Sequence, residues 1–177
     1  MGYTMHVVPH THWDREWYLT YEQFRIRLVD LIDNLLDILE TYPEFQSFNL
    51  DGQTIILEDY LQIRPENEEK LRRYIQEGRI HIGPWYVLND EYLVSGESTV
   101  RSLLVGHEIA KSFGNVMKIG YLPDQFGNIS QMPQILQEFG ITFAVVGRGR
   151  QLIGDRKMEF IWESPDGSRV LSSLMAF

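Results

Sequence analysis

Eight consecutive residues near the start of the chain combine metal-binding side chains with large aromatic rings. Residues 10–17 read His-Thr-His-Trp-Asp-Arg-Glu-Trp. In an extended segment His10, His12 and Asp14 emerge on one face, about 7 Å apart in succession. One divalent ion could bind two neighbours of this row, and imidazole nitrogen with carboxylate oxygen suits zinc better than calcium or magnesium. Trp17 would then offer a flat apolar face near the ion. Taken alone, the motif could also be a strand end and loop that are rich in His and Trp by chance.

The elements that must position this motif alternate between short apolar runs and longer amphipathic ones. This rhythm is typical of a parallel sheet covered by helices. We expect helices over residues 21–41, 55–63, 65–77, 96–113 and 131–139. We expect strands over residues 5–9, 46–50, 79–83, 118–122, 141–146, 159–163 and 169–174. The last two flank a Pro-Asp-Gly-Ser turn that is typical of an antiparallel hairpin. The predicted fold class is α/β, an incomplete β/α barrel-like domain with a mostly parallel sheet flanked by helices and a C-terminal β-hairpin.

Carboxylates follow three of the expected strands. Parallel sheets place their chemistry at the carboxyl ends of the strands. The polar and aromatic side chains at these ends are His12, Asp14 and Trp17, then Trp85, Asp90 and Glu91, then Asp124 and Gln125. Each loop alone could be helix capping or ordinary turn chemistry. Three loops that deliver carboxylates to one rim favour a common site.

Composition narrows the possible partners and surroundings of the chain. Its 177 residues carry a formal charge of −9 without a basic cluster, which argues against nucleic-acid binding. No segment approaches the roughly 18 uninterrupted apolar residues of a membrane span. The chain has no cysteine, so disulfides and thiolate metal sites are excluded. We expect a soluble, cytoplasmic protein without nucleic-acid or membrane partners.

Four sequence blocks resemble the N-terminal part of the catalytic domain of glycoside hydrolase family 38, the class II α-mannosidases. They cover residues 10–17, 83–90, 95–98 and 122–127, and the first block is most similar to the bacterial, mannosylglycerate hydrolase-like branch. Many family members have Pro-Gly where this chain has Arg15-Glu16. That difference brings charge near the substrate and leaves the substrate itself open.

The resemblance implies a role for five residues. His12 and Asp14 bind the metal, and Asp90 is both a metal ligand and the nucleophile. Trp17 forms part of the floor under the sugar, and Asp124 holds or orients substrate or metal ligands. The implied protein is a retaining, metal-dependent α-mannosidase with one Zn²⁺ per site, which hydrolyses the terminal α-mannosides of a glycoside or small oligosaccharide. Retaining hydrolysis needs two carboxyl groups about 5 to 5.5 Å apart.

Several expectations and alternatives remain at this point. We expect residues 1–177 to be the N-terminal portion of a larger enzyme, inactive alone, whose acid/base carboxylate and further histidine ligand lie later in the sequence. An open apolar sheet edge would favour homo-oligomers. We expect His10 to be hydrogen-bonded behind the ligands and His81 and His107 to be structural, whereas Trp85 could equally be core or sugar surface. Other functions are a metal-dependent carbohydrate deacetylase and a catalytically silent carbohydrate-binding module.

Overall fold

The computed structural model describes residues 2–149 and 157–175. The first half contains α1 (Tyr21–Thr41), β1 (Phe48–Asn49), α2 (Ile55–Leu61), the 3₁₀ turn η1 (Pro65–Asn67), α3 (Glu68–Gln76) and β2 (Ile80–His81). The second half contains α4 (Gly96–Phe113), β3 (Gly120–Leu122), α5 (Met132–Glu138), β4 (Phe143–Val146), β5 (Glu159–Glu163) and β6 (Arg169–Leu174). All five predicted helical regions are therefore present, with α1 and α4 at the predicted bounds.

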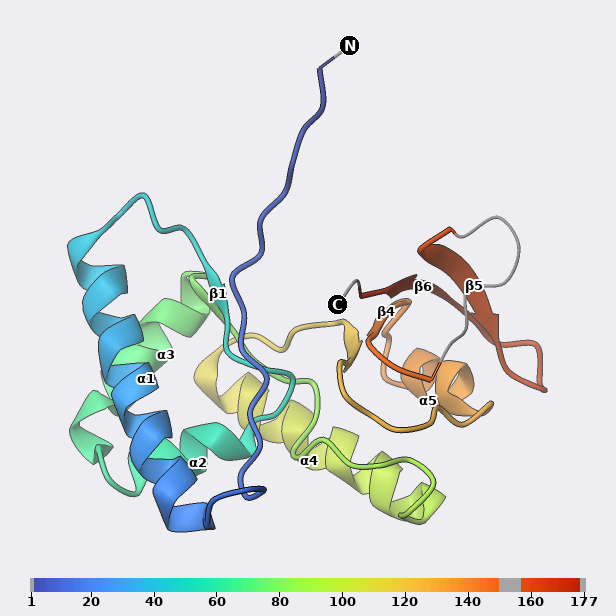
Figure 1. The fold of residues 1–177 in the computed structure, drawn as a ribbon, viewed down its shortest axis with the longest axis horizontal. Coiled ribbons are helices and arrows are strands. Elements are labelled where there is room, and N and C mark those ends of the chain that lie inside the picture. Colours follow the sequence, from blue (N-terminus) through green and yellow to red (C-terminus); the bar gives the residue numbers. More distant parts are fainter. Residues whose placement is uncertain (1, 150–156, 176–177) are drawn as a thin grey trace.

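The strands form two small sheets (Figure 1). β1 and β2 are a parallel pair, and the second sheet has the order β3-β4-β6-β5. β3, β4 and β6 are parallel, whereas β5 and β6 form the predicted antiparallel hairpin. The α/β class, the mostly parallel pairing and the hairpin are confirmed. The single sheet is corrected to two, because β1 and β2 pair with none of the other described strands. A cavity of about 600 Å³ is lined by residues of β1, β2, β3 and β4.

Each sheet has its own hydrophobic core, and α4 joins them. The regular spacing of apolar residues in α1 buries one stripe of that helix, including Leu28, Ile32 and Leu36, against the first core. The second core lies among α5, β3 and β4. Leu103 of α4 is buried in the second core, while Ala110 near its other end is buried in the first. Figure 1 shows α4 running from the middle of the molecule, near α3, toward the lower right, below α5.

The predicted strand over residues 5–9 is wrong. This segment has no strand structure, its side chains are largely exposed, and it extends away from the body in Figure 1. Only its end joins the first sheet, where the Asn49 amide donates to the Pro9 carbonyl and His10 forms a parallel bridge to Asn49. A strand needs a partner along its length, and the residues before Pro9 have none in the described part of the chain.

The helices were also compared with the length and hydropathy of membrane-spanning helices. No helix within residues 2–149 and 157–175 is both long enough and apolar enough to cross a bilayer.

Candidate metal centre

His12 lies among three aspartates that come from three different loops. Its Nε2 atom is 3.6 Å from Oδ1 of Asp14 and 3.8 Å from Oδ2 of Asp124. On the other side of the ring, Nδ1 is 3.8 Å from Oδ1 of Asp51. Asp51 follows β1 and Asp124 follows β3, so the carboxyl ends of the parallel strands converge, as the edge rule predicts.

The surroundings of His12 fit a cation. Both ring nitrogens are buried and lack a hydrogen-bond partner among the described residues, although carboxylates approach them from two sides. Zinc bonds of about 2.0 to 2.1 Å at tetrahedral angles place neighbouring ligand atoms roughly 3.3 Å apart. The separations of Nε2 from the Asp14 and Asp124 oxygens exceed this value by only a few tenths of an ångström. Imidazole and carboxylates are also the donor types that zinc binds.

The set is incomplete as it stands. Within the part of the chain that the structure describes, no group of three or more His, Asp or Glu side chains is arranged so that it could hold a metal ion. His12 therefore approaches Asp14 and Asp124 in two separate pairs, and the three side chains do not yet surround one common point. To coordinate one ion, the three side chains would have to move closer to one another.

The negative charges around His12 also favour a bound cation. The neighbouring Asp51 carboxylate raises the pKa of His12 above its usual value, burial opposes this effect, and Asp14 and Asp124 add to the increase. Three carboxylates therefore create a negative potential at one imidazole. A bound cation would relieve the repulsion among them.

The two carboxylate oxygens of Asp124 have different neighbours. One carboxylate oxygen, Oδ2, faces His12, and the other, Oδ1, accepts a hydrogen bond from the Arg148 guanidinium. Arg148 follows β4, which is the neighbour of β3 in the sheet. The guanidinium also lies over the ring of Phe126, with its Cζ atom 4.9 Å from the ring centre. These contacts fix the direction of the Asp124 carboxylate.

Asp90 lies outside the His12 group. Its Oδ1 atom accepts a hydrogen bond of 3.1 Å from the Phe126 amide, and its carboxylate is not among those within 4 Å of His12 in the described chain. The next residue, Glu91, is only 4% exposed and accepts a hydrogen bond of 2.6 Å from the Ile129 amide. Asp90 and Glu91 thus attach one loop to the loop that begins at Asp124.

The remaining predicted residues have distinct environments. Trp17 is 75% exposed and contacts the ring of Tyr18, so its indole is available at the surface. Trp85 is buried in the second core and donates its indole N–H to the Tyr121 carbonyl, which settles the open choice in favour of packing. His10 hydrogen-bonds to the Tyr121 hydroxyl at 3.1 Å, in line with a supporting role. His107 is buried and bonds to the Leu103 carbonyl, as expected of a structural histidine.

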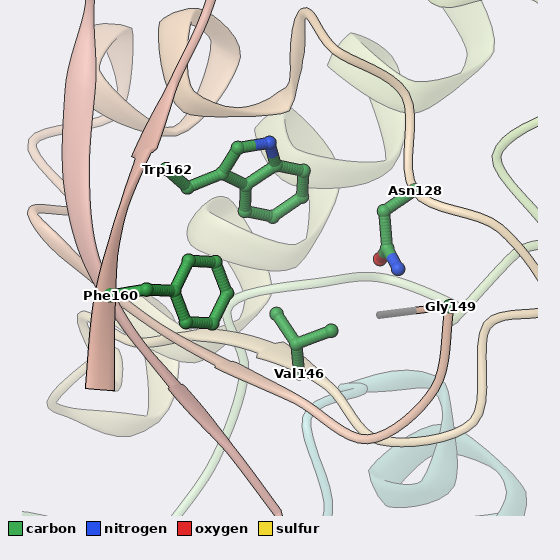
Figure 2. A pocket seen from close by; sticks show the side chains of 5 residues that line it. All are labelled: Asn128, Val146, Gly149, Phe160 and Trp162. Atoms are coloured by element: carbon green, nitrogen blue, oxygen red, sulfur yellow. The ribbon is translucent and has the colours of Figure 1, made fainter. Parts of the chain in front are cut away.

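A pocket of about 250 Å³ lies next to the loop that carries Arg148. Figure 2 shows Phe160 and Trp162 of β5 on one side and the Asn128 amide pointing into the space between them and Gly149. The Asn128 side chain donates to the Arg148 carbonyl at 2.9 Å. This volume falls short of the roughly 300 Å³ at which ligand pockets usually begin. The hydrogen bond from Asn128 instead links the loop after β3 to the segment that carries Arg148.

Sequence reasoning missed Asp51 and Arg148. Asp51 comes directly after the strand expected over residues 46–50, and Arg148 comes two residues after the strand expected over residues 141–146. Both follow strands of the parallel sheets, as Asp124 does, whereas His12 follows only the isolated bridge between His10 and Asn49. The rule that chemistry gathers at the carboxyl ends of strands was the signal that could have found them.

Comparison with known proteins establishes the family. The model for the glycosyl hydrolases family 38 N-terminal domain matches residues 2–177. The chain belongs to glycosyl hydrolase family 38. The resemblance carried by the four sequence blocks is therefore confirmed.

Relatives of this family 38 domain are much longer than the chain. A protein of Halalkalibacterium halodurans named "Putative mannosylglycerate hydrolase" is 48% identical over 99% of this chain and 21% of its own length. The crystal structure of an alpha-mannosidase from Enterococcus faecalis V583 has 48% identity and a TM-score of 0.92, covering 96% of this chain and 20% of that chain. Human alpha-mannosidase 2C1 is 29% identical over 96% of this chain and 16% of its own length. The chain thus spans about a fifth of the length of the two relatives that are 48% identical to it.

Proposed function

We propose that this family 38 domain supplies the cation-binding residues of a retaining α-mannosidase. The relatives named above as alpha-mannosidases support the substrate class. The single observation that carries the metal assignment is the approach of Asp14 and Asp124 to the same buried, unpartnered Nε2 atom of His12. We therefore propose that His12, Asp14 and Asp124 bind one divalent ion, which the donor set suggests is zinc.

The cation would act as a template for the substrate. When bound, it would supply positive charge that holds two neighbouring hydroxyl groups of a mannose ring and favours the oxocarbenium-like transition state. The chain's own residues determine where that ring lies. Trp17 offers an exposed apolar ring that could stack against the C–H face of the sugar.

The geometry favours Asp124 over Asp90 as the nucleophile. The anomeric carbon is bonded to C2, so a hydroxyl on C2 held by the cation brings the anomeric carbon next to the ligand carboxylates. Asp124 directs one oxygen toward His12, while Asp90 uses a carboxylate oxygen to hold the Phe126 amide. We propose that Asp124 attacks the anomeric carbon and that Asp90 supports the loop that carries it.

Arg148 prepares Asp124 for this role. The guanidinium hydrogen-bonds to Oδ1 of Asp124 and holds the carboxylate in one direction. A nucleophilic carboxylate must be deprotonated, and a fixed direction reduces the entropy lost on reaching the transition state. Retaining hydrolysis also needs a proton donor. We assign that role to no residue of this chain.

Hydrolysis assays test the proposal. The full-length protein should hydrolyse an aryl α-mannoside, and mannosylglycerate is a second substrate to test because of the name of the Halalkalibacterium halodurans relative. Removal of divalent ions with a chelator should abolish turnover, and zinc should restore it. Proton NMR of the first-formed product should show α-mannose, since a covalent intermediate retains the configuration.

Three results would contradict this proposal. Turnover that survives complete metal removal would exclude the cation's role, and β-mannose as the first product would exclude a retaining reaction. Release of acetate from an acetylated sugar without mannoside hydrolysis would instead support the deacetylase reading.

A further inference from the structure

Asp51 is a buried carboxylate with three fixed hydrogen bonds. Its side chain is 0% exposed. Oδ1 accepts from the Gly52 amide at 2.7 Å, and Oδ2 accepts from the Trp13 amide at 3.0 Å and from Nε2 of Gln53 at 2.7 Å. Because buried polar oxygens are costly without such donors, these bonds satisfy the carboxylate and hold it in place.

The backbone at Asp51 is held in an unusual conformation. Its φ is 59°, and it is the one non-glycine residue of the described chain with a positive φ. Aspartate tolerates this region better than most residues, because its short side chain can bond to the local backbone. The bond to the next amide, that of Gly52, is of this kind. The strain is consistent with a carboxylate that must point in a defined direction.

That direction is toward His12. Oδ1 of Asp51 is 3.8 Å from Nδ1 of His12, while Oδ2 holds the amide of the next residue, Trp13. A shift of about 0.9 Å would bring the first pair to a normal hydrogen-bond length. Within residues 2–149 and 157–175, Nδ1 of His12 has no hydrogen-bond partner. Asp51 therefore fixes both the backbone beside His12 and the side of the ring that faces away from Asp14 and Asp124.

We propose that Asp51 is a positioning residue that accepts a hydrogen bond from Nδ1–H of His12 and so presents Nε2 to the cation. The inference rests on the proposed cation site and names a residue that the site itself does not include. Carboxylates that bond to the far nitrogen of a ligand histidine set its tautomer and its ring orientation. Asp51 would therefore act through His12 and would touch neither substrate nor ion.

The first test needs no substitution. In the zinc-loaded, full-length protein labelled with ¹⁵N-histidine, the His12 signals can be identified by their loss in His12→Gln. We expect the ring proton of His12 on Nδ1 and the zinc-coordinated nitrogen to be Nε2. Zinc coordinated by Nδ1 would overturn the inference while leaving the proposed function intact. Wild-type protein that binds no zinc would instead overturn the proposed function.

The second test measures zinc affinity by competition with a chelating dye. Asp51→Asn should weaken zinc binding about 10- to 100-fold, because one face of the asparagine side chain presents an N–H group where His12 and its neighbours need an acceptor. The matched control is Asp33→Asn. Asp33 also accepts from three donors, Tyr60, Arg64 and Asn67, but it lies on α1 away from His12.

The control separates positioning from a general loss of stability. Asp33→Asn should lower the melting temperature and leave zinc affinity within about threefold of the wild type. Equal losses of affinity in both variants, or none in Asp51→Asn, would overturn the positioning role. If Asp51→Asn does not fold, the tautomer of the wild-type protein still decides the question.

Discussion

At the residue scale, the sequence predicted the approach of neighbouring side chains within one segment better than contacts between distant loops. The spacing of His12 and Asp14 predicted that both emerge on one side of the chain, and the structure places them 3.6 Å apart at Nε2 and Oδ1. Choosing among the carboxylates of later loops was beyond a single sequence. Loop conformation decides whether Asp90 or Asp124 points toward His12, and that conformation depends on long-range hydrogen bonds such as that from the Phe126 amide to Asp90.

Glu91 gives a prediction about pH at this scale. Burial raises the pKa of Glu91 to about 7, and Asp90 adds to the increase although the Ile129 amide opposes it. The unfolded chain releases this proton near pH 4.5. Folding stability should therefore fall as the pH rises from about 4.5 to about 7, by up to about 3 kcal/mol from this group, and then change little.

Melting temperatures measured between pH 5 and pH 8 can isolate this contribution. Glu91→Gln resembles the protonated acid in shape and should be more stable than the wild type at pH 8, with a smaller difference at pH 5. A wild-type advantage that grows toward pH 8 would show that Glu91 is stabilising as a charged group.

At the scale of elements, helices were predictable and strand lengths were not. The apolar stripe of α1 lies within a single element, and its period is visible in the sequence. The strands are two to six residues long and need partners from distant segments. Residues 5–9 are apolar enough for a strand but lack a partner along most of their length in the described structure, which no local pattern reveals.

The contact between α4 and the chain around Trp85 gives a second prediction. A Cβ atom added to Gly106 would lie 2.3 Å from the Pro84 carbonyl oxygen and from the Trp85 carbonyl carbon, both backbone atoms. Gly106→Ala should therefore push α4 away from the segment that leads to Asp90, with a loss of about 1 to 3 kcal/mol in stability.

Gly96→Ala is the matched control on the same helix. A Cβ atom there meets nothing within 4 Å, so this variant should be neutral or more stable by up to about 1 kcal/mol. Chemical denaturation with a helical signal measures both variants. Equal stability of Gly106→Ala and Gly96→Ala would show that the close approach of α4 can relax at no cost.

At the scale of the whole molecule, the candidate site joins the two halves of the fold. Asp14 and His12 belong to the segment that precedes α1, whereas Asp124 follows β3 in the second sheet. Elsewhere α4 packs on both cores, and a cavity lies between their sheets. A cation bound by all three residues would tie these sheets together, so its binding should also stabilise the fold.

Metal content measured by elemental analysis tests the central claim, which is that His12, Asp14 and Asp124 share one cation. The full-length wild-type protein and Asp90→Ala should each contain about one divalent ion per chain, while His12→Ala and Asp124→Ala should contain little. Loss of the ion in Asp90→Ala with retention in Asp124→Ala would contradict the account, as would wild-type protein that binds no ion.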